Sequence, residues 1–384
     1  MTQIRQLLLL FASSSAVACG ALSSDVDKSS AEVSTNAGTF AIGVGANPEK
    51  TNYQGVTRGL QLAIERLNDD STARATRFSL RAPDAGASSA VQIAQQLRDD
   101  PSVIAVVGHP ESGTSLEAIP VYADEEHANA DAVVAISPTA SSPRLSGASA
   151  WFFRVAPSDN ETARLVAAYV ADSLKAKTVA VIYRNDSYGR DWSARFAETF
   201  TARNGSILAK VPYLTKITEW DAYALQLKAL APEVLLFPGD ADDATAMLRA
   251  LKKHDVNLTF VGGDATAGIA RSHEFPEAKY TAFFVPERAT SAEGKRFVES
   301  YRARYNEEPD MYAALSYDAA IAIGRTVIAG ARNRKALRDA LEKMNGTMSL
   351  EGAGGRIAFD ARHDITGRTI VIATVGSAPR GAAK

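Results

Sequence analysis

Short apolar runs alternate with stretches of helical periodicity along most of the chain. Val103–Val107 is a continuous run rich in β-branched residues, which is typical of a strand buried on both faces of a parallel sheet. In Gln54–Asn68 the apolar residues instead recur every three or four positions, which predicts an amphipathic helix. The same alternation resumes at Thr178–Tyr183 and continues beyond it. It predicts an α/β fold with parallel sheets.

Two neighbouring predicted strands end in turns rich in hydroxyl groups. The strand Val103–Val107 leads into residues 108–114, and the strand Val133–Ile136 leads into residues 137–142. Because the carboxyl ends of adjacent parallel strands meet at one edge of a sheet, these turns are expected to form the mouth of a pocket. The free amides at a helix start attract anions. The pattern therefore predicts a site for a small ligand that bears a carboxylate.

The last third of the chain has a different pattern. Helices are expected over Glu293–Tyr305 and Tyr312–Ala329, where apolar residues again follow helical spacing. The segments Gly352–Asp360 and Thr369–Val375 are expected to close the chain as a hairpin-like pair of strands. No internal repeat, long block of charge or second apolar span interrupts this arrangement.

Length and charge narrow the class of protein. A chain of 384 residues is too long for one ordinary core, so two domains are expected. The hydrophobic content of 46% and charged content of 22% are typical of a globular protein. A net charge of −2 gives no attraction to nucleic acid, and no nucleic-acid partner is expected.

The beginning of the chain has the features of an export signal. Arg5 precedes the apolar stretch Leu7–Ala12, and small residues surround the only cysteine, Cys19. This region resembles a bacterial lipobox, in which Cys19 would be acylated, become the mature N-terminus and anchor the protein to a lipid bilayer. Ala16 replaces the usual leucine of that motif. The alternative is simple cleavage after Ala18 that leaves the cysteine unmodified.

Several chemistries are not supported by the motifs. The Gly43–Gly45 turn lacks the third glycine of a dinucleotide-binding loop, and Pro48 interrupts it. His109 lies near Ser112, but no GxSxG motif or third catalytic residue accompanies them, so hydrolysis is not expected. The five histidines are scattered without a carboxylate or cysteine cluster. Neither a metal nor a cofactor is expected.

Eight motifs in one order connect the chain to a known family. They are GHPESGTS, AISPTASSPRL, FFRVAPSDN, VAVIYRNDSYGRDW, FPGDADDA, FVGGDA, ALSYDAA and GRIAFDARHD. Together they resemble the type I periplasmic binding proteins, and within them the branched-chain amino acid receptors of ABC importers. The resemblance extends from Phe40 to Val375. It implies two Rossmann-like lobes joined by a hinge of three crossings, with the ligand bound between the lobes.

The resemblance also implies a division of the chain. Crossings are expected near residues 156, 284 and 349, which agrees with breaks in composition at Pro157, Pro286 and Gly352–Gly355. The implied parts are residues 1–19 as the lipoprotein signal peptide with its cysteine, 20–39 as a flexible tether, 40–155 plus 284–348 as lobe 1, 156–283 plus 349–375 as lobe 2, and 376–384 as a tail.

The family pattern assigns the two ends of an amino acid to opposite lobes. Ser112 and Ser141 match the positions that bind the α-carboxylate, and Thr139 matches the position that offers its backbone carbonyl to the amine. Asp264 matches the acidic residue that faces the ammonium. As alternatives, Ser112 is a simple helix N-cap and Asp264 is a turn residue that serves its own backbone.

Three further residues are implied less directly. Tyr188 matches an aromatic residue that would cover the ammonium through a cation–π contact, although it could simply pack between the lobes. Asp240 stands where these receptors often carry an aromatic residue, which indicates a more polar ligand, but it could also cap the following helix. Tyr53 lies in a loop that would reach over the ligand side chain.

These features predict an extracytoplasmic solute-binding lipoprotein of the periplasm or cell envelope, not an enzyme. It would bind an amino acid or similar zwitterion and deliver it to an ABC permease. The alternative is a lipoprotein sensor or a regulator of an envelope enzyme that uses the same fold as an interaction module. That alternative predicts a closed or degenerate cleft, with Ser112 and Asp264 turned away from each other.

Overall fold

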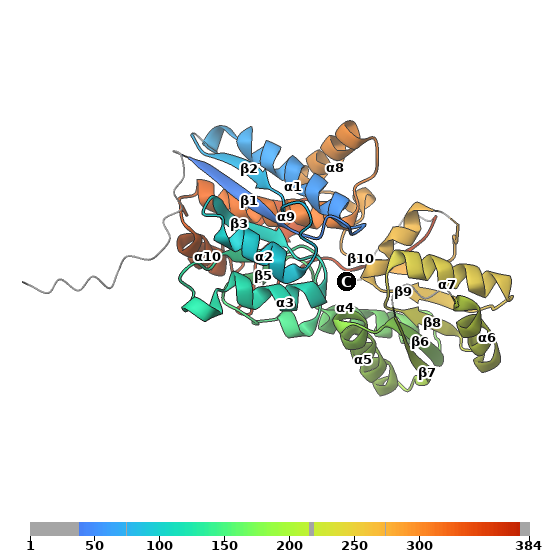
Figure 1. Ribbon diagram of the computed structural model, residues 1–384. Helices are drawn as coiled ribbons and strands as arrows, with labels where there is room; N and C mark the ends of the chain where they lie inside the picture. Colours follow the sequence, from blue (N-terminus) through green and yellow to red (C-terminus); the bar gives the residue numbers. More distant parts are fainter. Residues whose placement is uncertain (1–37, 74, 215–218, 273, 377–384) are drawn as a thin grey trace, which may run out of the picture.

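The computed structural model describes residues 38–376, except 74, 215–218 and 273. Within this range the chain forms two lobes, each built on its own sheet (Figure 1). The expected signal peptide, Cys19, the tether up to residue 37 and the tail from residue 377 lie outside the described residues. No helix in the described part of the chain is long and apolar enough to cross a membrane.

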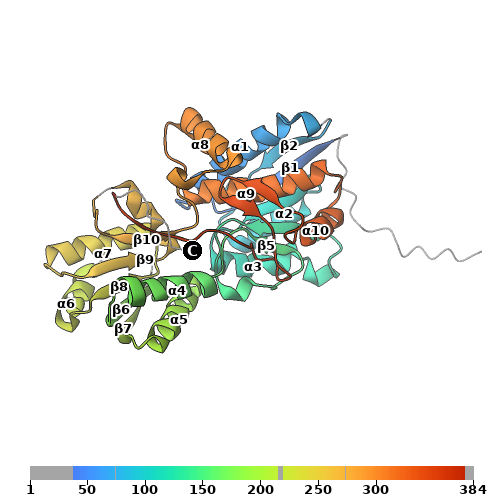
Figure 2. The same ribbon diagram turned by 180° about the vertical axis from the view of Figure 1, so that it is seen from behind.

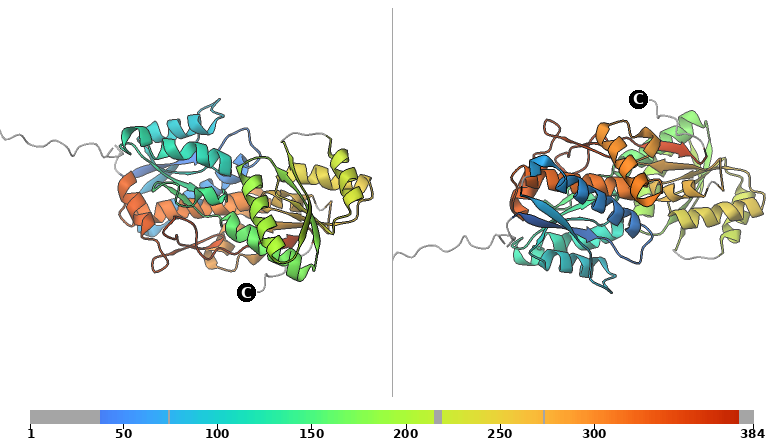
Figure 3. Two further views of the ribbon diagram at one scale, coloured as in Figure 1. Left: turned by 90° about the horizontal axis from the view of Figure 1, so that it is seen from below. Right: turned by 90° about the horizontal axis from the view of Figure 1, so that it is seen from above.

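The first lobe contains a parallel sheet of five strands in the order β2-β1-β3-β4-β5. Helices α2 and α3 cover one face of this sheet, and α1, α9 and α10 cover the other (Figure 3). The elements are β1 Thr39–Gly45, α1 Tyr53–Asn68, β2 Arg77–Arg81, α2 Ala90–Asp99, β3 Val103–Gly108, α3 Ser112–Tyr122, β4 Val134–Ser137, β5 Phe152–Arg154, α8 Ala292–Tyr305, α9 Met311–Ile328 and α10 Arg334–Glu342.

The second lobe contains a sheet of six strands in the order β13-β10-β9-β8-β6-β7. All neighbouring pairs are parallel except β10 and β13, which run antiparallel. The elements are α4 Asp159–Ala168, the π-helical turn η4 Tyr169–Ser173, β6 Thr178–Arg184, α5 Ser187–Ala202, β7 Ser206–Tyr213, α6 Trp220–Leu230, β8 Val234–Phe237, α7 Ala241–Lys253, β9 Thr259–Gly262, the 3-10 helix η5 Asp264–Arg271, β10 Lys279–Ala282 and β13 Val371–Thr374.

The chain passes between the lobes three times. It leaves the first sheet after β5, returns after β10, and crosses again before β13, as the view from behind shows (Figure 2). The short hairpin of β11 Leu350–Gly352 and β12 Gly355–Ile357 packs against α9 in the first lobe. The expected division placed all of 349–375 in the second lobe, whereas only β13 lies in the second sheet.

The expected pairing of the last two strand segments is wrong. Residues 352–360 do not pair with 369–375; instead β11 pairs with β12, and β13 pairs with β10. The reason is that Gly355, at a positive φ of 108°, allows a tight turn after Gly352, so that the start of the first segment pairs with the residues just before it. Strand β13 is then free to extend the second sheet.

Close packing of α1 against α9 fixes one side of the region between the lobes. A Cβ added at Gly59 of α1 would lie only 2.1 Å from the carbonyl oxygen of Ala313 in α9, so only glycine fits there. The two helices therefore approach backbone to backbone, and their N-terminal ends are held side by side. Both of these ends border the cavity described below.

Candidate functional site

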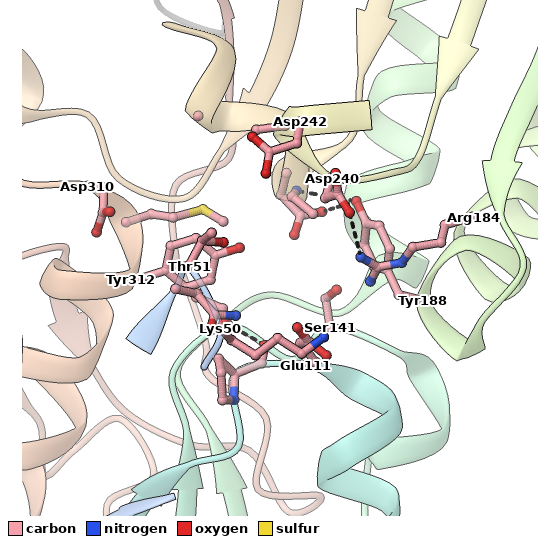
Figure 4. Close-up of a pocket in the computed structure, with 18 of the residues that line it drawn as sticks. Lys50, Thr51, Glu111, Ser141, Arg184, Tyr188, Asp240, Asp242, Asp310 and Tyr312 are labelled. Atoms are coloured by element: carbon pink, nitrogen blue, oxygen red, sulfur yellow. Dashed lines mark hydrogen bonds and ion pairs between the residues drawn. The ribbon is translucent and has the colours of Figure 1, made fainter. Parts of the chain in front are cut away.

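A cavity of about 550 Å³ lies between the lobes (Figure 4). Its wall is formed by turns at the carboxyl ends of strands and by the starts of helices, as expected for parallel α/β sheets. Six of the seven residues expected from the sequence line it, namely Ser112, Thr139, Ser141, Tyr188, Asp240 and Asp264. Tyr53 does not line it; this residue begins α1 and packs against the first-lobe core, while Lys50–Asn52 just before it face the cavity.

Ser112 connects the two hydroxyl-rich turns of the first lobe. It is the first residue of α3, and its Oγ accepts a hydrogen bond of 3.1 Å from the backbone N–H of Ser142. The N-cap position belongs to Glu111, whose side chain makes no capping bond. The hydroxyl of Thr139 in turn donates to the carbonyl of Pro110 at 2.7 Å. The two turns therefore form one hydrogen-bonded unit.

Ser141 is the unsatisfied member of this wall. Its side chain is buried, and its Oγ forms no hydrogen bond of standard geometry among the described residues, although the Asp159 carboxylate lies close to it. A buried polar group without a partner costs about 1–3 kcal/mol. Figure 4 shows the side chain at the edge of the cavity. The hydroxyl is therefore available to a group that enters the cavity.

Arg154 holds the second turn in place, a role that was not predicted from the sequence. Its guanidinium is fully buried and donates to the carbonyl of Ser142 at 2.8 Å and to Ser146 Oγ at 2.6 Å. It also forms an ion pair of 2.7 Å with Asp364. The partner lies 210 residues away in the sequence, so no local motif could have indicated the pair. Arg154 is a positioning residue for the serine-bearing turn.

Asp264 is the central residue of the opposite wall. It begins η5 directly after β9, and only 2% of its surface is exposed. The Tyr188 hydroxyl donates to its Oδ1 at 3.0 Å. Burial raises the pKa of the Asp264 carboxyl to about 6. A cation in the cavity would compensate for this burial and lower the pKa again.

A second buried carboxylate, Asp159, lies beside this group. Both of its oxygens lack hydrogen-bond partners among the described residues. Its backbone N–H donates to the carbonyl of Ser141 at 2.8 Å, which connects it to the first-lobe wall. Burial, together with the negative charge of Asp264, raises the pKa of Asp159 well above its usual value. The N-cap of α4 is Ser158, so the Asp159 side chain does not cap its helix.

Tyr188 and Asp240 are both connected to Arg184. The Arg184 guanidinium lies 5.9 Å from the centre of the Tyr188 ring, so one cation already faces this aromatic residue. Arg184 is paired with Asp186 and, at 3.4 Å, with Asp240. Asp240 also caps α7 by accepting a bond of 2.9 Å from the backbone of Asp243. Asp240 thus serves as a helix cap and as a lining residue at once.

Polar contacts bridge the lobes on two sides of the cavity. On one side Arg271 of η5 pairs with Asp310, the N-cap of α9, at 2.6 Å. On the other side Asp191 of α5 accepts a hydrogen bond from Ser142 and pairs with Arg144 at 3.2 Å. The lobes are therefore in direct contact at both rims of the cavity.

The site does not contain a serine–histidine pair. His109 is buried, and its Nε2 lies 3.0 Å from the hydroxyl of Tyr122, not from Ser112. Burial lowers the pKa of His109 to about 3, so its ring is neutral. Among the described residues no group of three or more His, Cys, Asp or Glu side chains is arranged to hold a metal ion.

Known proteins are similar to this chain in sequence and in fold. The chain is 28% identical over 273 residues to an amino acid binding protein of Pseudomonas aeruginosa, covering 68% of this chain and 70% of that protein. The structure is similar to the branched-chain amino acid transporter substrate-binding protein LivJ from Streptococcus pneumoniae in complex with isoleucine. The TM-score is 0.78 at 24% identity, and the match covers 88% of this chain and 96% of that one.

A substrate-binding protein of an ABC transporter from Desulfitobacterium hafniense, in complex with Leu, is also similar. Its TM-score is 0.73 at 26% identity, with 88% of this chain and 97% of that chain covered. These similarities confirm the α/β fold with two parallel-sheet lobes. The family and these structural relatives are solute-binding proteins, not enzymes. The model of the periplasmic binding protein family matches residues 47–380, so the chain belongs to that family, with relatives of the branched-chain amino acid transporter type.

Proposed function

We propose that this protein is the extracytoplasmic solute-binding component of an ABC importer and that it binds an amino acid or a similar small zwitterion between its lobes. One observation carries this proposal. Serine hydroxyls at a helix start and a buried carboxylate line opposite walls of a single cavity of about 550 Å³. Such walls complement a molecule with a negative and a positive end. The relatives crystallised with isoleucine and leucine bind ligands of this kind.

The α-carboxylate would bind at the first-lobe wall. The Ser141 hydroxyl has no other partner among the described residues, and Ser112 Oγ can donate its own proton while it accepts from Ser142. The first amides of α3 lack intrahelical acceptors and carry the positive end of the helix dipole. Together these groups offer several hydrogen bonds to an anion without a full positive charge.

The α-ammonium would bind at the second-lobe wall. Asp264 offers a carboxylate whose burial is costly until a cation pairs with it. The backbone carbonyl of Thr139 remains our candidate for a second acceptor. Tyr188 orients Asp264 through its hydroxyl, so its main contribution is to position the carboxylate.

Anchoring and delivery complete the proposal. Acylation of Cys19 would tether the protein to a bilayer, and an ABC permease would receive the ligand. The family places the protein in the periplasm. The alternative, an interaction module without a small ligand, requires a closed or degenerate cleft. The open cavity, lined by both Ser112 and Asp264, favours ligand binding over that alternative.

A thermal-shift titration of the protein against the common amino acids tests this function. A ligand that binds only the folded state raises Tm progressively as its concentration exceeds Kd. Ser112→Ala and Asp264→Ala are expected to abolish or strongly reduce the shift. Glu161→Gln is a matched control, because Glu161 is an exposed first-turn residue of α4 that does not line the cavity. If no amino acid shifts Tm, the interaction-module alternative is favoured.

A further inference from the structure

We propose that the side chain of the bound amino acid carries a second positive charge, as in arginine, lysine or ornithine, and that Asp242 selects for it. This inference rests on the proposed function and concerns the part of the cavity beyond the α-carboxylate and α-ammonium. Asp242 is the second residue of α7 and belongs to the second-lobe wall.

The remaining wall combines apolar groups, such as Ala265, Met311 and Tyr312, with charged ones. The start of α7 contributes Asp242 and Asp243, and the first lobe contributes Lys50, Glu111 and Asp310. An aliphatic group placed here would remove water from charged side chains and give them no hydrogen bond in return, which is costly. A side chain with an apolar stem and a polar end therefore fits this wall better than a wholly aliphatic one.

The charge of the lining determines the sign of the ligand group. The cavity is lined by three cationic side chains, Lys50, Arg184 and Arg271, and by twice as many carboxylates. These carboxylates are Glu111, Asp240, Asp242, Asp243, Asp264 and Asp310. Arg184 and Arg271 are already paired with carboxylates. An anionic ligand side chain would add to the surplus of negative charge, whereas a cationic one would reduce it.

Asp242 is the carboxylate best placed to contact such a group. Its side chain makes no hydrogen bond or ion pair with any described residue, and Figure 4 shows it directed into the cavity, across from Ser141. An acidic residue in a first turn also stabilises its helix, but Asp240 already caps α7. Asp243 adds a buried Oδ2 that has no partner among the described residues. The buried, unpartnered hydroxyl of Ser141 independently marks the same cavity as a ligand site.

Isothermal titration of the purified protein with L-arginine, L-lysine, L-citrulline, L-leucine and L-glutamate tests the inference. Citrulline is the key comparison, because it matches arginine in shape and lacks the charge. We expect arginine or lysine to bind about tenfold more tightly than citrulline and leucine, and glutamate to bind most weakly. Asp242→Asn should weaken the cationic ligand about three- to fivefold, as expected for a solvent-accessible ion pair, and leave citrulline within about twofold.

The control and the contrary outcomes separate the two proposals. Glu161→Gln removes a first-turn carboxylate of α4 outside the cavity and should change no affinity. If leucine or glutamate bound as tightly as arginine and lysine, the proposal of a cationic ligand side chain would be overturned, whereas the proposal of amino acid binding would stand. Equal weakening of arginine and citrulline by Asp242→Asn would overturn the role of Asp242. Failure of every amino acid to bind would contradict the proposed function itself.

Discussion

The two walls of the cavity are built on different physical principles. Apart from Lys50, Glu111 and Asp310 towards the rim, the first-lobe wall consists of hydroxyls and backbone groups that bond to one another, as Ser112 does to Ser142 and Thr139 to Pro110. The second-lobe wall consists of charged groups whose balance is incomplete, with Asp264 buried beside Tyr188 and an excess of carboxylates around Arg184. Before a ligand binds, the first-lobe wall is therefore closer to electrostatic balance than the second-lobe wall.

Because of this difference, the two walls are expected to contribute differently to ligand binding. Neutral donors fixed by the backbone can orient a carboxylate with little rearrangement. Buried carboxylates gain more from a ligand, because the ligand supplies the cation that they lack. The first wall should therefore contribute orientation and the second wall most of the affinity. Four perturbations of decreasing size test this comparison.

The largest effect is expected from removal of the Asp264 carboxylate. Asp264→Ala should weaken the best amino acid ligand roughly 100-fold, because the ammonium loses its charged acceptor. The empty variant should be at least as stable as the native protein at pH 7. The raised pKa means that ionisation of Asp264 destabilises the folded state as pH rises from about 4 to about 6. Titration calorimetry measures the affinity, and thermal unfolding measures the stability. A loss of affinity below tenfold would contradict the claim that the second-lobe wall supplies most of the affinity.

Acidification should produce the next largest effect. The pKa of Asp264 is raised to about 6 by burial, so the carboxylate is largely protonated at pH 5 and cannot pair with an ammonium. Affinity should fall roughly tenfold between pH 7.5 and pH 5. Burial also raises the pKa of Asp243 to about 6, so protonation of Asp243 would further weaken the binding of a cationic side chain at low pH. Asp264→Asn should flatten most of the profile, and equal affinity at both pH values would show that Asp264 is not the acceptor.

Ser141→Ala tests the first wall. It should weaken binding about fivefold, the value of one neutral hydrogen bond, and leave the stability of the empty protein unchanged or slightly higher. The reason for the second effect is that the hydroxyl has no partner among the described residues when the cavity is empty. Ser112→Ala differs because it also removes the acceptor for Ser142, so Tm should fall. If both variants lowered Tm equally, the unpartnered state of Ser141 would be contradicted.

The smallest effect is expected at the rim. Arg271→Ala removes the ion pair that joins η5 to the start of α9, and should raise Kd about twofold because Arg271 is 70% exposed. Arg249→Ala is the matched control, since it removes an exposed arginine–glutamate pair with Glu274 inside the second lobe. Calorimetry at low and high salt measures both variants. A tenfold loss of affinity in Arg271→Ala would show that the ion pair at the rim, and not the second-lobe wall, contributes most of the affinity.

The sequence predicted most of the first wall, because strand ends and hydroxyl-rich turns are local signals. The expectation for Asp264 came instead from the family resemblance, although this residue also lies just after an apolar strand. Whether the six expected lining residues bind a ligand stays a prediction. Tyr53 was expected in a loop over the ligand side chain, but α1 begins at this residue and packs it against the core, while Lys50–Asn52 line the cavity.

Other features depend on contacts between distant residues. Arg154 pairs with Asp364, and Asp159 is buried beside Asp264, so neither environment is visible in a local motif. The pairing of β13 with β10 likewise joins segments separated by the whole of α8, α9 and α10. The helix α10 was not predicted at all, although its apolar face packs into the first-lobe core through Leu337 and Leu341.

The placement of β13 has a consequence for how the molecule can be assembled. The lobe encoded in the middle of the chain receives its edge strand β13 from residues 371–374, while the lobe encoded first takes α8, α9 and α10 from beyond the middle. Neither lobe can be excised as one continuous piece without losing part of its architecture. A nascent polypeptide must therefore be nearly complete before either half can close its core.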